Sequence, residues 1–336
     1  MTSVDESRTT PRVVAVVPTL GAPHVVAAVR SALDQTYPNL EVVVSVDGPA
    51  ADLAALLPDD GRLRVVWSAE SRGPRAARAA GIDAAGPVDY IALLDDDDRW
   101  HPDKISRQVA AAEAAIAAGA RNVAVLCRMN LVEPDGRTIQ TVPRRLLSPG
   151  ERVADYLFVR REVKPGSAVV AASMALLSRE AALDAMRTGA SHLHEDWEAL
   201  MRLDDDPSTV ILMLDEVLLD YVVQPVGGSA SSRAAWRMSR DWFVDHRSQL
   251  TPRELGDGLL CVTAVLAAAQ GDRRGAMAVA HSVLAERSAG WRAWAFFGAT
   301  ILVPRRLARA LSRRRVPLPR ASGTGGRTTA RQRRRS

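Results

Sequence analysis

The sequence predicts an α/β fold with a doubly wound, mostly parallel sheet flanked by helices, followed by a helical carboxyl-terminal extension. Three observations predict it. Short, β-branched apolar runs end at breakers such as Pro18 or Asp47-Gly48, which is typical of buried parallel strands. These runs alternate with segments whose apolar residues recur at helical spacing. Beyond residue 225 only the helical period remains.

The alternation of strand and helix is clearest in the first third of the chain. Strands are expected at 12–17, 40–46, 63–67 and 90–94, and helices at 25–33, 74–85 and 102–118. Pro102 favours a helix start, because the first helical position needs no intrahelical hydrogen bond from its backbone nitrogen. Each strand–helix–strand unit predicts a parallel pair of strands joined by a crossover helix.

The rest of the chain is predicted to be more mixed. We expect an antiparallel excursion at 122–143 and strands at 169–177, 210–214 and 217–223, with helices at 179–187 and 194–203. Residues 232–312 predict about four helices, two of them joined by a turn at Gly271-Asp272. The chain therefore divides into a disordered start (1–10), an α/β domain (11–225), a helical extension (226–304) and a basic, largely disordered tail (305–336).

The net charge is distributed unevenly along the chain. The 336 residues carry a formal charge of +5, but residues 305–336 hold twelve Arg and no acid, so residues 1–304 carry −7. A protein that binds nucleic acid over its whole surface is basic in its body as well. Nucleic acid is therefore not an expected partner.

Cysteine usage and the first residues point to a compartment. Cys127 and Cys261 are too few and too far apart for a disulfide framework or a cysteine metal site. The first ten residues lack the apolar stretch of a secretory signal, and no run approaches the ~20 apolar residues of a membrane-spanning helix. We expect a cytoplasmic protein.

The stretch 291–315 has two interpretations. Its apolar and aromatic part, from Trp291 to Val303, is followed at once by a cluster of Arg, and an interfacial helix needs both features. Peripheral contact with the inner face of the membrane is one expectation. Packing of the aromatic residues on the rest of the protein is the other, and the sequence leaves the choice open.

Four carboxylates, Asp95 to Asp98, follow the predicted strand at 90–94. Open α/β sheets bind ligands at the carboxyl ends of their strands, and adjacent anions favour a divalent cation such as Mg²⁺ or Mn²⁺, which keeps positions open for substrate phosphates. A solvated acidic loop is the alternative. Asp204-Asp205-Asp206 has that character, because it follows a helix and no strand aims it at a crevice.

Two other acidic positions are candidates. Asp47, at the end of the second strand, could accept hydrogen bonds from a nucleobase or ribose, although Asp-Gly is also a common turn pair. Glu195 and Asp196 lie in the first turn of a helix, where acids serve either as helix caps or as a rigidly held general base. His192 and His194 have no third ligand nearby, so a metal site there is not expected.

Taken in order, these motifs resemble family 2 of the GT-A glycosyltransferases over residues 12–225. The matching pieces are Pro18-Thr19, Val46-Asp47-Gly48, Gly73 to Ile82, Leu94 to Ile105, and His194-Glu195-Asp196-Trp197. The acidic motif with its trailing Trp100 and Pro102-Asp103-Lys104 is the most specific. Relatives often have Arg-Asn where this chain has Arg78-Ala79, which puts the role of Arg78 in question. Gln-x-x-Arg-Trp is missing after residue 196, so a processive, membrane-embedded polysaccharide synthase is not expected.

The resemblance implies a GT-A domain with a Rossmann-like sheet and an inverting transfer of sugar from a nucleoside diphosphate sugar, with a UDP-sugar as the first expectation. The acceptor would be a hydroxyl, open to being lipid-linked. By position, Pro18, Thr19, Asp47 and Asp96 would line the nucleoside, with Arg78 and Asp95 also at the sugar donor. Asp97, with Asp95, would hold Mg²⁺ or Mn²⁺, and Asp196 would be the general base.

Two other functions stay open at this point. A nucleotidyltransferase would use a similar sheet and metal but attack phosphorus, and it commonly has a Gly-rich basic loop where residues 18–23 have one Gly and no base. A non-enzymatic RNA-binding or scaffold protein would use the Arg tail, against which the acidic body argues.

Overall fold

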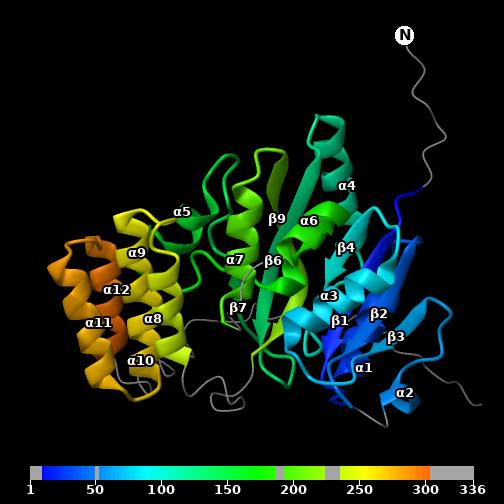
Figure 1. The fold of residues 1–336 in the computed structure, drawn as a ribbon, viewed down its shortest axis with the longest axis horizontal. Coiled ribbons are helices and arrows are strands. Elements are labelled where there is room, and N and C mark those ends of the chain that lie inside the picture. Colours follow the sequence, from blue (N-terminus) through cyan, green and yellow to red (C-terminus); the bar gives the residue numbers. More distant parts are fainter. Residues whose placement is uncertain (1–9, 50–52, 187–192, 224–234, 303–336) are drawn as a thin grey trace, which may run out of the picture.

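Four Val-rich or apolar runs form the parallel half of the central sheet. In the computed structural model, which describes residues 10–49, 53–186, 193–223 and 235–302, these are β1 (Val13–Thr19), β2 (Leu40–Val46), β3 (Leu63–Trp67) and β4 (Tyr90–Leu93), in the order β3-β2-β1-β4 (Figure 1). All side chains of β1 are buried, because strands lie on both sides of it and helices cover both faces. Thr19 pairs with Val46, so β1 and β2 end together.

The other half of the nine-stranded sheet is mixed. It contains β5 (Arg99–Trp100), β6 (Asn122–Val132), β7 (Thr138–Val142), β8 (Leu176–Ser178) and β9 (Thr209–Val222), and only the β6/β9 pair is parallel. The strand expected at 169–177 is wrong except for its last two residues, because Ala172–Met174 form a 3₁₀ turn and β8 begins only at Leu176. The two strands expected at 210–214 and 217–223 are one, because a bulge beside Asp215 and Glu216 lets both side chains reach solvent without ending the ladder.

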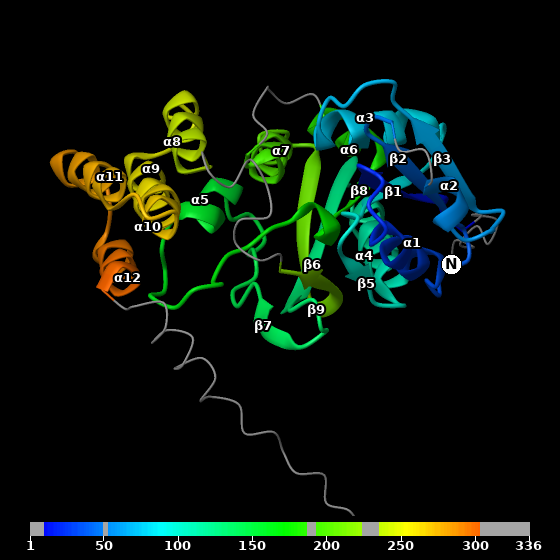
Figure 2. The same cartoon turned by 90° about the horizontal axis from the view of Figure 1, so that it is seen from below.

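Helices cover both faces of the sheet (Figure 2). One face carries α1 (Val25–Leu33) and α4 (Lys104–Ala117), and the other carries α3 (Pro74–Ala85) and α6 (Arg179–Ala185), with α7 (Glu195–Asp204) beside α6. A Cβ at Gly81 would lie 2.4 Å from Val16 Cγ1, so glycine there lets α3 approach β1 closely. The short helices are α2 (Leu53–Leu56) and α5 (Val153–Phe158). The predicted α/β architecture is confirmed.

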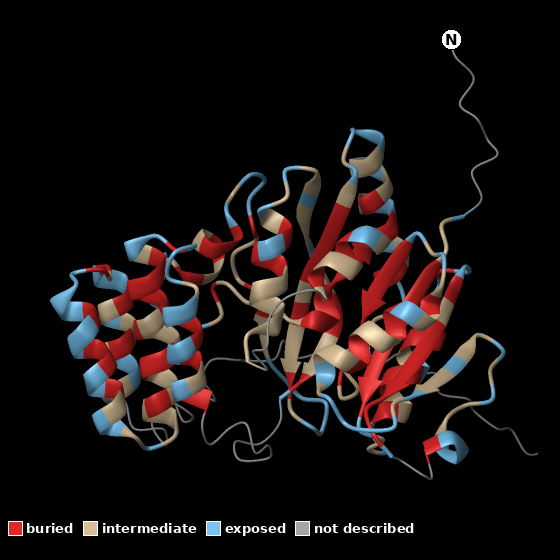
Figure 3. Cartoon of the chain, in the orientation of Figure 1, coloured by how far each residue is buried: buried red, intermediate tan, exposed pale blue. Residues whose placement is uncertain are grey.

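The carboxyl-terminal helices pack around a second hydrophobic core. They are α8 (Ala235–Asp245), a continuous rod of α9 (Pro252–Gly258), a π-helical segment (Leu259–Ala264) and α10 (Val265–Ala269), then α11 (Arg273–Ala285) and α12 (Trp291–Leu302). Leu260, Ala264 and Phe297 are buried in this core. Figure 3 shows the buried residues of these helices in red. None of the helices in the described part of the chain has the length and apolar character to cross a bilayer.

The helical extension is joined to the α/β domain by polar and aromatic contacts. Glu254 of α9 is fully buried and accepts a hydrogen bond from Arg152 Nη1 at 2.7 Å. Trp197 of α7 packs against Phe158 and Trp242 with ring centroids 5.4 and 6.1 Å apart. These contacts couple α8 and α9 to the helix that begins with Glu195 and Asp196. The disordered start expected at 1–10, apart from Thr10, and the basic tail expected at 305–336 lie outside the described residues.

Candidate active site

The acidic motif leaves the sheet where β4 ends. Asp98 is fully buried: its Oδ2 accepts a hydrogen bond from Ser173 Oγ at 2.6 Å and its Oδ1 accepts one from Val222 N at 3.1 Å. Burial, together with the charges of Asp95 and Asp97, raises the pKa of Asp98 to about 8. Asp98 therefore joins β9 to the motif, whereas Asp95, Asp96 and Asp97 are partly exposed.

Pro18, Thr19 and Asp96 come together at the ends of β1 and β4. Thr19 Oγ1 donates to Asp96 Oδ2 at 2.5 Å and accepts a hydrogen bond from Gly21 N at 2.9 Å. His24, just before α1, places its Nε2 3.3 Å from Asp96 Oδ1. Sequence reasoning missed His24, because a lone His beside a predicted helix start gives no signal of what it faces.

Asp47 holds the loop that leads into α3. Its carboxylate accepts hydrogen bonds from Ser71 Oγ, Arg72 N and Gly73 N, each at 2.8 Å. Burial on its own would raise the pKa of Asp47, but these hydrogen bonds outweigh it and leave the pKa below its ordinary value. Asp47 thus fixes the start of α3 against the end of β2.

Arg78 connects the acidic motif to the later pair of acids. Its guanidinium is nearly buried; Nη2 donates to Asp95 Oδ1 at 2.7 Å and Nη1 to Glu195 Oε2 at 3.2 Å. Burial alone would lower the pKa of Arg78, but Asp95, Asp196 and Glu195 raise it above its ordinary value. The structure therefore gives Arg78 a defined position despite the Ala at residue 79.

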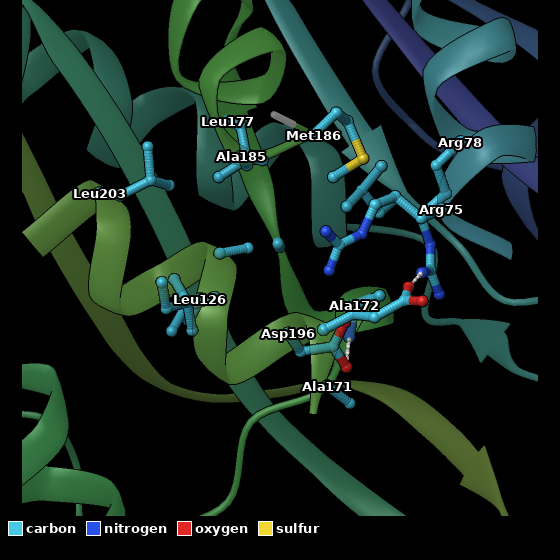
Figure 4. Close-up of a pocket in the computed structure, with 15 residues that line it drawn as sticks. Arg75, Arg78, Leu126, Ala171, Ala172, Leu177, Ala185, Met186, Asp196 and Leu203 are labelled. Carbon is cyan, nitrogen blue, oxygen red and sulfur yellow. Dashed lines mark hydrogen bonds and ion pairs between the residues drawn. The ribbon is translucent and has the colours of Figure 1, made fainter. Parts of the chain in front are cut away.

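Asp196 lies in the first turn of α7, beside Glu195. Its Oδ2 accepts a hydrogen bond from Ala172 N at 3.1 Å. Burial raises the pKa of Asp196 to about 6. The charge of Arg78 opposes this rise, and the charges of Asp95 and Glu195 add to it. In Figure 4, Asp196 and Arg78 extend toward one cavity from α7 and α3. Because Arg78 binds Glu195, the two adjacent acids have different surroundings.

A second, open cavity of about 240 Å³ lies beside the same carboxylate. Its lining is Pro74, Arg78, His194, Glu195, Asp196 and Trp197. His194 itself is stacked on Trp197, with ring centroids 3.9 Å apart, and its Nε2 lies 3.0 Å from Ser239 Oγ. Burial lowers the pKa of His194 to about 4, so it is a neutral packing residue between α7 and α8. His192 lies outside the described residues.

The turn Ala172–Met174 is the part of the site that sequence reasoning missed. Ala172 N holds Asp196, Ser173 Oγ accepts a hydrogen bond from Asp95 N at 3.0 Å, and Ser173 O accepts one from Trp100 Nε1 at 3.1 Å. Its letters, Ala-Ser-Met within an apolar run, are typical of a strand. The signal that could have found it is a single Ser among otherwise apolar residues.

The other acidic triplet has structural contacts. Asp204 Oδ2 accepts a hydrogen bond from Val153 N at 2.9 Å. Asp206 accepts hydrogen bonds from the Ser208 and Thr209 hydroxyls at 2.8 Å. These contacts hold the end of α7 against α5 and against the start of β9, so two of the three acids have structural partners.

A divalent cation at this edge of the sheet would have to take some of its ligands from the substrate. Within the described residues, no three His, Cys, Asp or Glu side chains converge on a metal site. Mg²⁺ usually keeps several waters and takes one or two carboxylates plus substrate phosphates, and does not require a complete protein cage. Asp95 and Asp97 at the sheet edge are an oxygen donor set of that kind.

A sheet edge that carries an acidic motif, connected through a buried Arg to a second pair of acids, is the arrangement of a GT-A glycosyltransferase. Comparison with known families gives the particular one. Residues 14–184 match the family model described as glycosyl transferase family 2, and the chain belongs to this family. It is therefore a glycosyltransferase, with an α/β domain of the GT-A type.

Two relatives are named for the biosynthesis of amylovoran and of succinoglycan. The chain is 26% identical over 229 residues to the amylovoran biosynthesis glycosyltransferase AmsB of Erwinia amylovora, covering 66% of this chain and 73% of AmsB. It is 42% identical over 123 residues to the succinoglycan biosynthesis protein ExoO of Rhizobium meliloti, covering 35% of this chain and 33% of ExoO. The chain thus spans about a third of the length of ExoO.

Two solved structures share the fold. The S. aureus TarS structure (residues 1–349) in complex with UDP-GlcNAc superposes with a TM-score of 0.50 at 13% identity, covering 85% of this chain and 83% of TarS. The mannosyltransferase PcManGT from Pyrobaculum calidifontis, in complex with GDP-Man and Mn²⁺, gives 0.50 at 16% identity, covering 88% and 86%. At these identities the likeness establishes the fold.

Ser173→Ala tests the role of the turn. We expect the free energy of unfolding to fall by about 1–3 kcal/mol, because a buried hydroxyl that donates to Asp98 and accepts from Asp95 N is lost. Urea unfolding followed by circular dichroism measures it. Ser282→Ala, on the exposed side of α11, is the control and should change stability by no more than about 0.5 kcal/mol. Equal stability of the two variants would contradict the assignment.

Proposed function

We propose that the chain is an inverting glycosyltransferase that moves a sugar from a nucleoside diphosphate sugar to an acceptor hydroxyl, with Asp196 as general base. The observation that carries the proposal is the arrangement of acids around Arg78. This guanidinium links Asp95, at the carboxyl edge of the sheet, to Glu195, the neighbour of Asp196, and Asp196 borders an open cavity. A sugar donor bound at the sheet edge would therefore meet a base on α7.

The sugar donor is assigned to the ends of β1, β2 and β4. Pro18, Thr19, Asp47 and Asp96 would line the nucleoside, with Thr19 and Asp96 positioned by their mutual hydrogen bond. Family membership supports a nucleotide sugar, as do the UDP-GlcNAc and GDP-Man complexes of the two fold relatives. A UDP-sugar is the first candidate.

Asp97, with Asp95, is assigned to Mg²⁺ or Mn²⁺. When bound, such an ion would neutralise the charge that develops on the leaving diphosphate. Arg78 orients Asp95 through its hydrogen bond.

Proton removal is assigned to Asp196. An acceptor hydroxyl in the open cavity would lose its proton to this carboxylate as its oxygen attacks the anomeric carbon. A single in-line displacement inverts that carbon. Arg78 engages Glu195 and Ala172 N orients Asp196, which supports Asp196 over Glu195 as the base.

The acceptor is proposed to be carried by a membrane. One relative, 35% identical over 85 residues, is the Escherichia coli glucosyltransferase WfaP, whose name specifies a diphosphoundecaprenol-linked acceptor. We propose a cytoplasmic protein that contacts the inner face of the membrane through residues 291–315. Trp291 is 66% exposed, whereas Phe297 is buried in the helical core, so part of this stretch packs within the protein. Membership of this family decides against the nucleotidyltransferase and the non-enzymatic scaffold.

Asp97→Ala tests the metal assignment. The variant should stay folded and lose Mn²⁺-dependent binding of UDP and of UDP-sugars, because one of two carboxylate ligands is gone. Thermal shift with UDP, with and without Mn²⁺, measures binding, since a ligand of the native state raises stability. Asp205→Ala, an exposed acid in the other triplet, is the matched control. An unchanged metal titration in the Asp97 variant would sink the assignment.

Asp196→Asn tests the base. Asn keeps the size of the side chain but cannot accept a proton as a carboxylate does, so turnover should fall by at least ~10² while affinity for the sugar donor stays nearly unchanged. Steady-state transfer kinetics measure both. Glu195→Gln is the companion variant; if it loses turnover while Asp196→Asn keeps wild-type turnover, the two roles are exchanged.

The pH dependence extends this test. Asp196 faces Arg78 of α3, Asp95 after β4, Glu195 of α7 and Tyr221 of β9, and its pKa is raised to about 6. A base must be deprotonated to act, so the wild-type rate should fall as pH drops below about 6. Asp196→Asn should lack this acid limb. A wild-type rate that stays flat down to pH 4.5 would contradict the assignment.

The test of membrane contact changes only the Arg residues after α12. Deleting α12 itself would disturb folding, because Ala293 and Phe297 belong to the helical core. The variant replaces the Arg cluster by Gln (Arg305, Arg306, Arg309, Arg313, Arg314 and Arg315). Each Arg near an anionic leaflet is worth roughly 1 kcal/mol, so three engaged residues give roughly hundredfold enrichment that salt weakens. Co-sedimentation with anionic vesicles measures it; equal sedimentation of variant and wild type removes the hypothesis.

A further inference from the structure

A basic cavity of about 180 Å³ lies between the α/β domain and the helical extension. It is bounded by α5 and the residues after it, by the segment 167–170, by Trp197 of α7 and by the π-helical segment with Cys261 and Val262. Figure 2 shows α5 between α7 and the carboxyl-terminal helices. Three Arg line it, namely Arg145, Arg160 and Arg161.

Two of these cations share one carboxylate. Arg145 Nη1 lies 2.6 Å from Glu151 Oε2, and Arg161 Nη2 lies 3.3 Å from Glu151 Oε1. The Arg145 guanidinium also lies over the Tyr156 ring at 4.7 Å, and its Nε is buried without a hydrogen-bond partner. One Glu therefore balances two Arg, and a positive charge is left over at the cavity.

Arg160 has no carboxylate partner among the described residues. Its Nη2 donates to Lys164 O at 2.5 Å, its guanidinium stacks on Phe296 at 3.8 Å, and its Nε is buried without a hydrogen-bond partner. The nearby Asp257 is already engaged: it accepts hydrogen bonds from Arg160 N, Arg253 Nε and Gly290 N, each at 2.8 Å. Burial lowers the pKa of Arg160; Arg144 adds to this effect, while Cys261 and Asp257 oppose it.

A partly buried guanidinium that forms no ion pair is unfavourable unless a ligand supplies the charge. Guanidinium groups bind phosphate oxygens with two parallel hydrogen bonds, and three of them line this cavity. The remaining lining is largely apolar, with Leu157, Phe158, Val170 and Val262. The chemistry fits a phosphate or diphosphate that carries an apolar or sugar substituent.

The cavity also lies next to the base. Trp197 lines both this cavity and the open cavity at Asp196. The segment 167–170 along its wall leads directly to Ala172, whose N binds Asp196 Oδ2. A molecule whose phosphate occupied the basic cavity could extend past Trp197 and present a hydroxyl to Asp196.

We propose that this cavity binds the phosphate-bearing end of the acceptor, through Arg160 and Arg161 with Arg145 behind them. The proposal rests on the glycosyl transfer assigned to Asp196 and adds the class of acceptor, a sugar phosphate or a lipid-linked sugar diphosphate. This anion site is separate from the acids assigned to the diphosphate of the sugar donor, and it needs no metal.

The test uses the full-length protein in EDTA, where the site at Asp95 and Asp97 cannot hold a metal-bound diphosphate. Inorganic pyrophosphate and geranyl diphosphate are titrated by calorimetry. Both should bind wild type, and Arg160→Gln and Arg161→Gln should each weaken binding by roughly tenfold, the loss of one charge-assisted contact. Arg137→Gln is the matched control, because Arg137 is exposed on the β6–β7 hairpin and its replacement removes the same charge away from the cavity.

The outcomes distinguish a lipid-linked phosphate from a sugar phosphate, and they distinguish failure of this proposal from failure of the proposed function. Tighter binding of geranyl diphosphate supports a lipid-linked acceptor, and equal binding of both probes supports a sugar phosphate. No binding to wild type, or equal loss in Arg137→Gln and Arg161→Gln, overturns the proposal. Arg161 is half exposed, so its variant reports on binding even if Arg160→Gln does not fold. Asp97→Ala should keep pyrophosphate binding in EDTA, so a failure at the metal site would leave this test intact.

Discussion

The buried carboxylate of Asp98 is the constraint on which the site depends. A polar group without solvent must find hydrogen-bond partners, and Asp98 finds them in Ser173 Oγ and Val222 N. To supply the first, the chain between α5 and β8 must turn where an apolar run would otherwise continue as a strand. The same turn presents Ala172 N to Asp196 and Ser173 O to Trp100. The hydrogen bonds of one buried acid thus fix the turn that contacts both the acidic motif and Asp196.

The charge distribution around Arg78 differentiates acids that look alike in sequence. Glu195 and Asp196 are adjacent, yet Arg78 forms an ion pair with Glu195, while Asp196 is oriented by a backbone amide and has a raised pKa. Asp95 and Asp98 are three residues apart, yet one faces Arg78 and the other is enclosed between β9 and the turn. A buried cation between two acidic motifs costs desolvation, which the surrounding carboxylates offset. Arg78 thereby holds the acidic motif next to the start of α7, although the carboxylates on the two sides repel each other.

The helical extension is part of the support of the site. His194, in a left-handed conformation immediately before α7, stacks on Trp197 and contacts Ser239 of α8. The start of α7 is therefore packed from outside the α/β domain, and Asp196 lies two residues further on. The aromatic residues of α12 divide between roles: Phe297 is in the helical core, Phe296 stacks on Arg160, and Trp291 is exposed. One helix therefore packs within the protein and also leaves Trp291 exposed, so its packing does not exclude the proposed membrane contact.

The sequence alone determined the local elements and the candidate acids, because both depend on short-range pattern. Val-rich runs and helical periods predict β1, α1, β2, β3 and α3 within two residues of their observed bounds. The acidic motif after an apolar strand and the Glu195-Asp196 pair indicated the family to which the chain belongs. Tertiary structure decided what those residues contact. Asp98 is buried against β9, and Asp47 holds the loop 71–73. Arg78 bridges residues 95 and 195, and Ser173 lies in a turn where a strand was expected. These contacts depend on partners up to 124 positions away in the chain. No local period records such contacts, because they form only when the sheet brings distant segments to one edge.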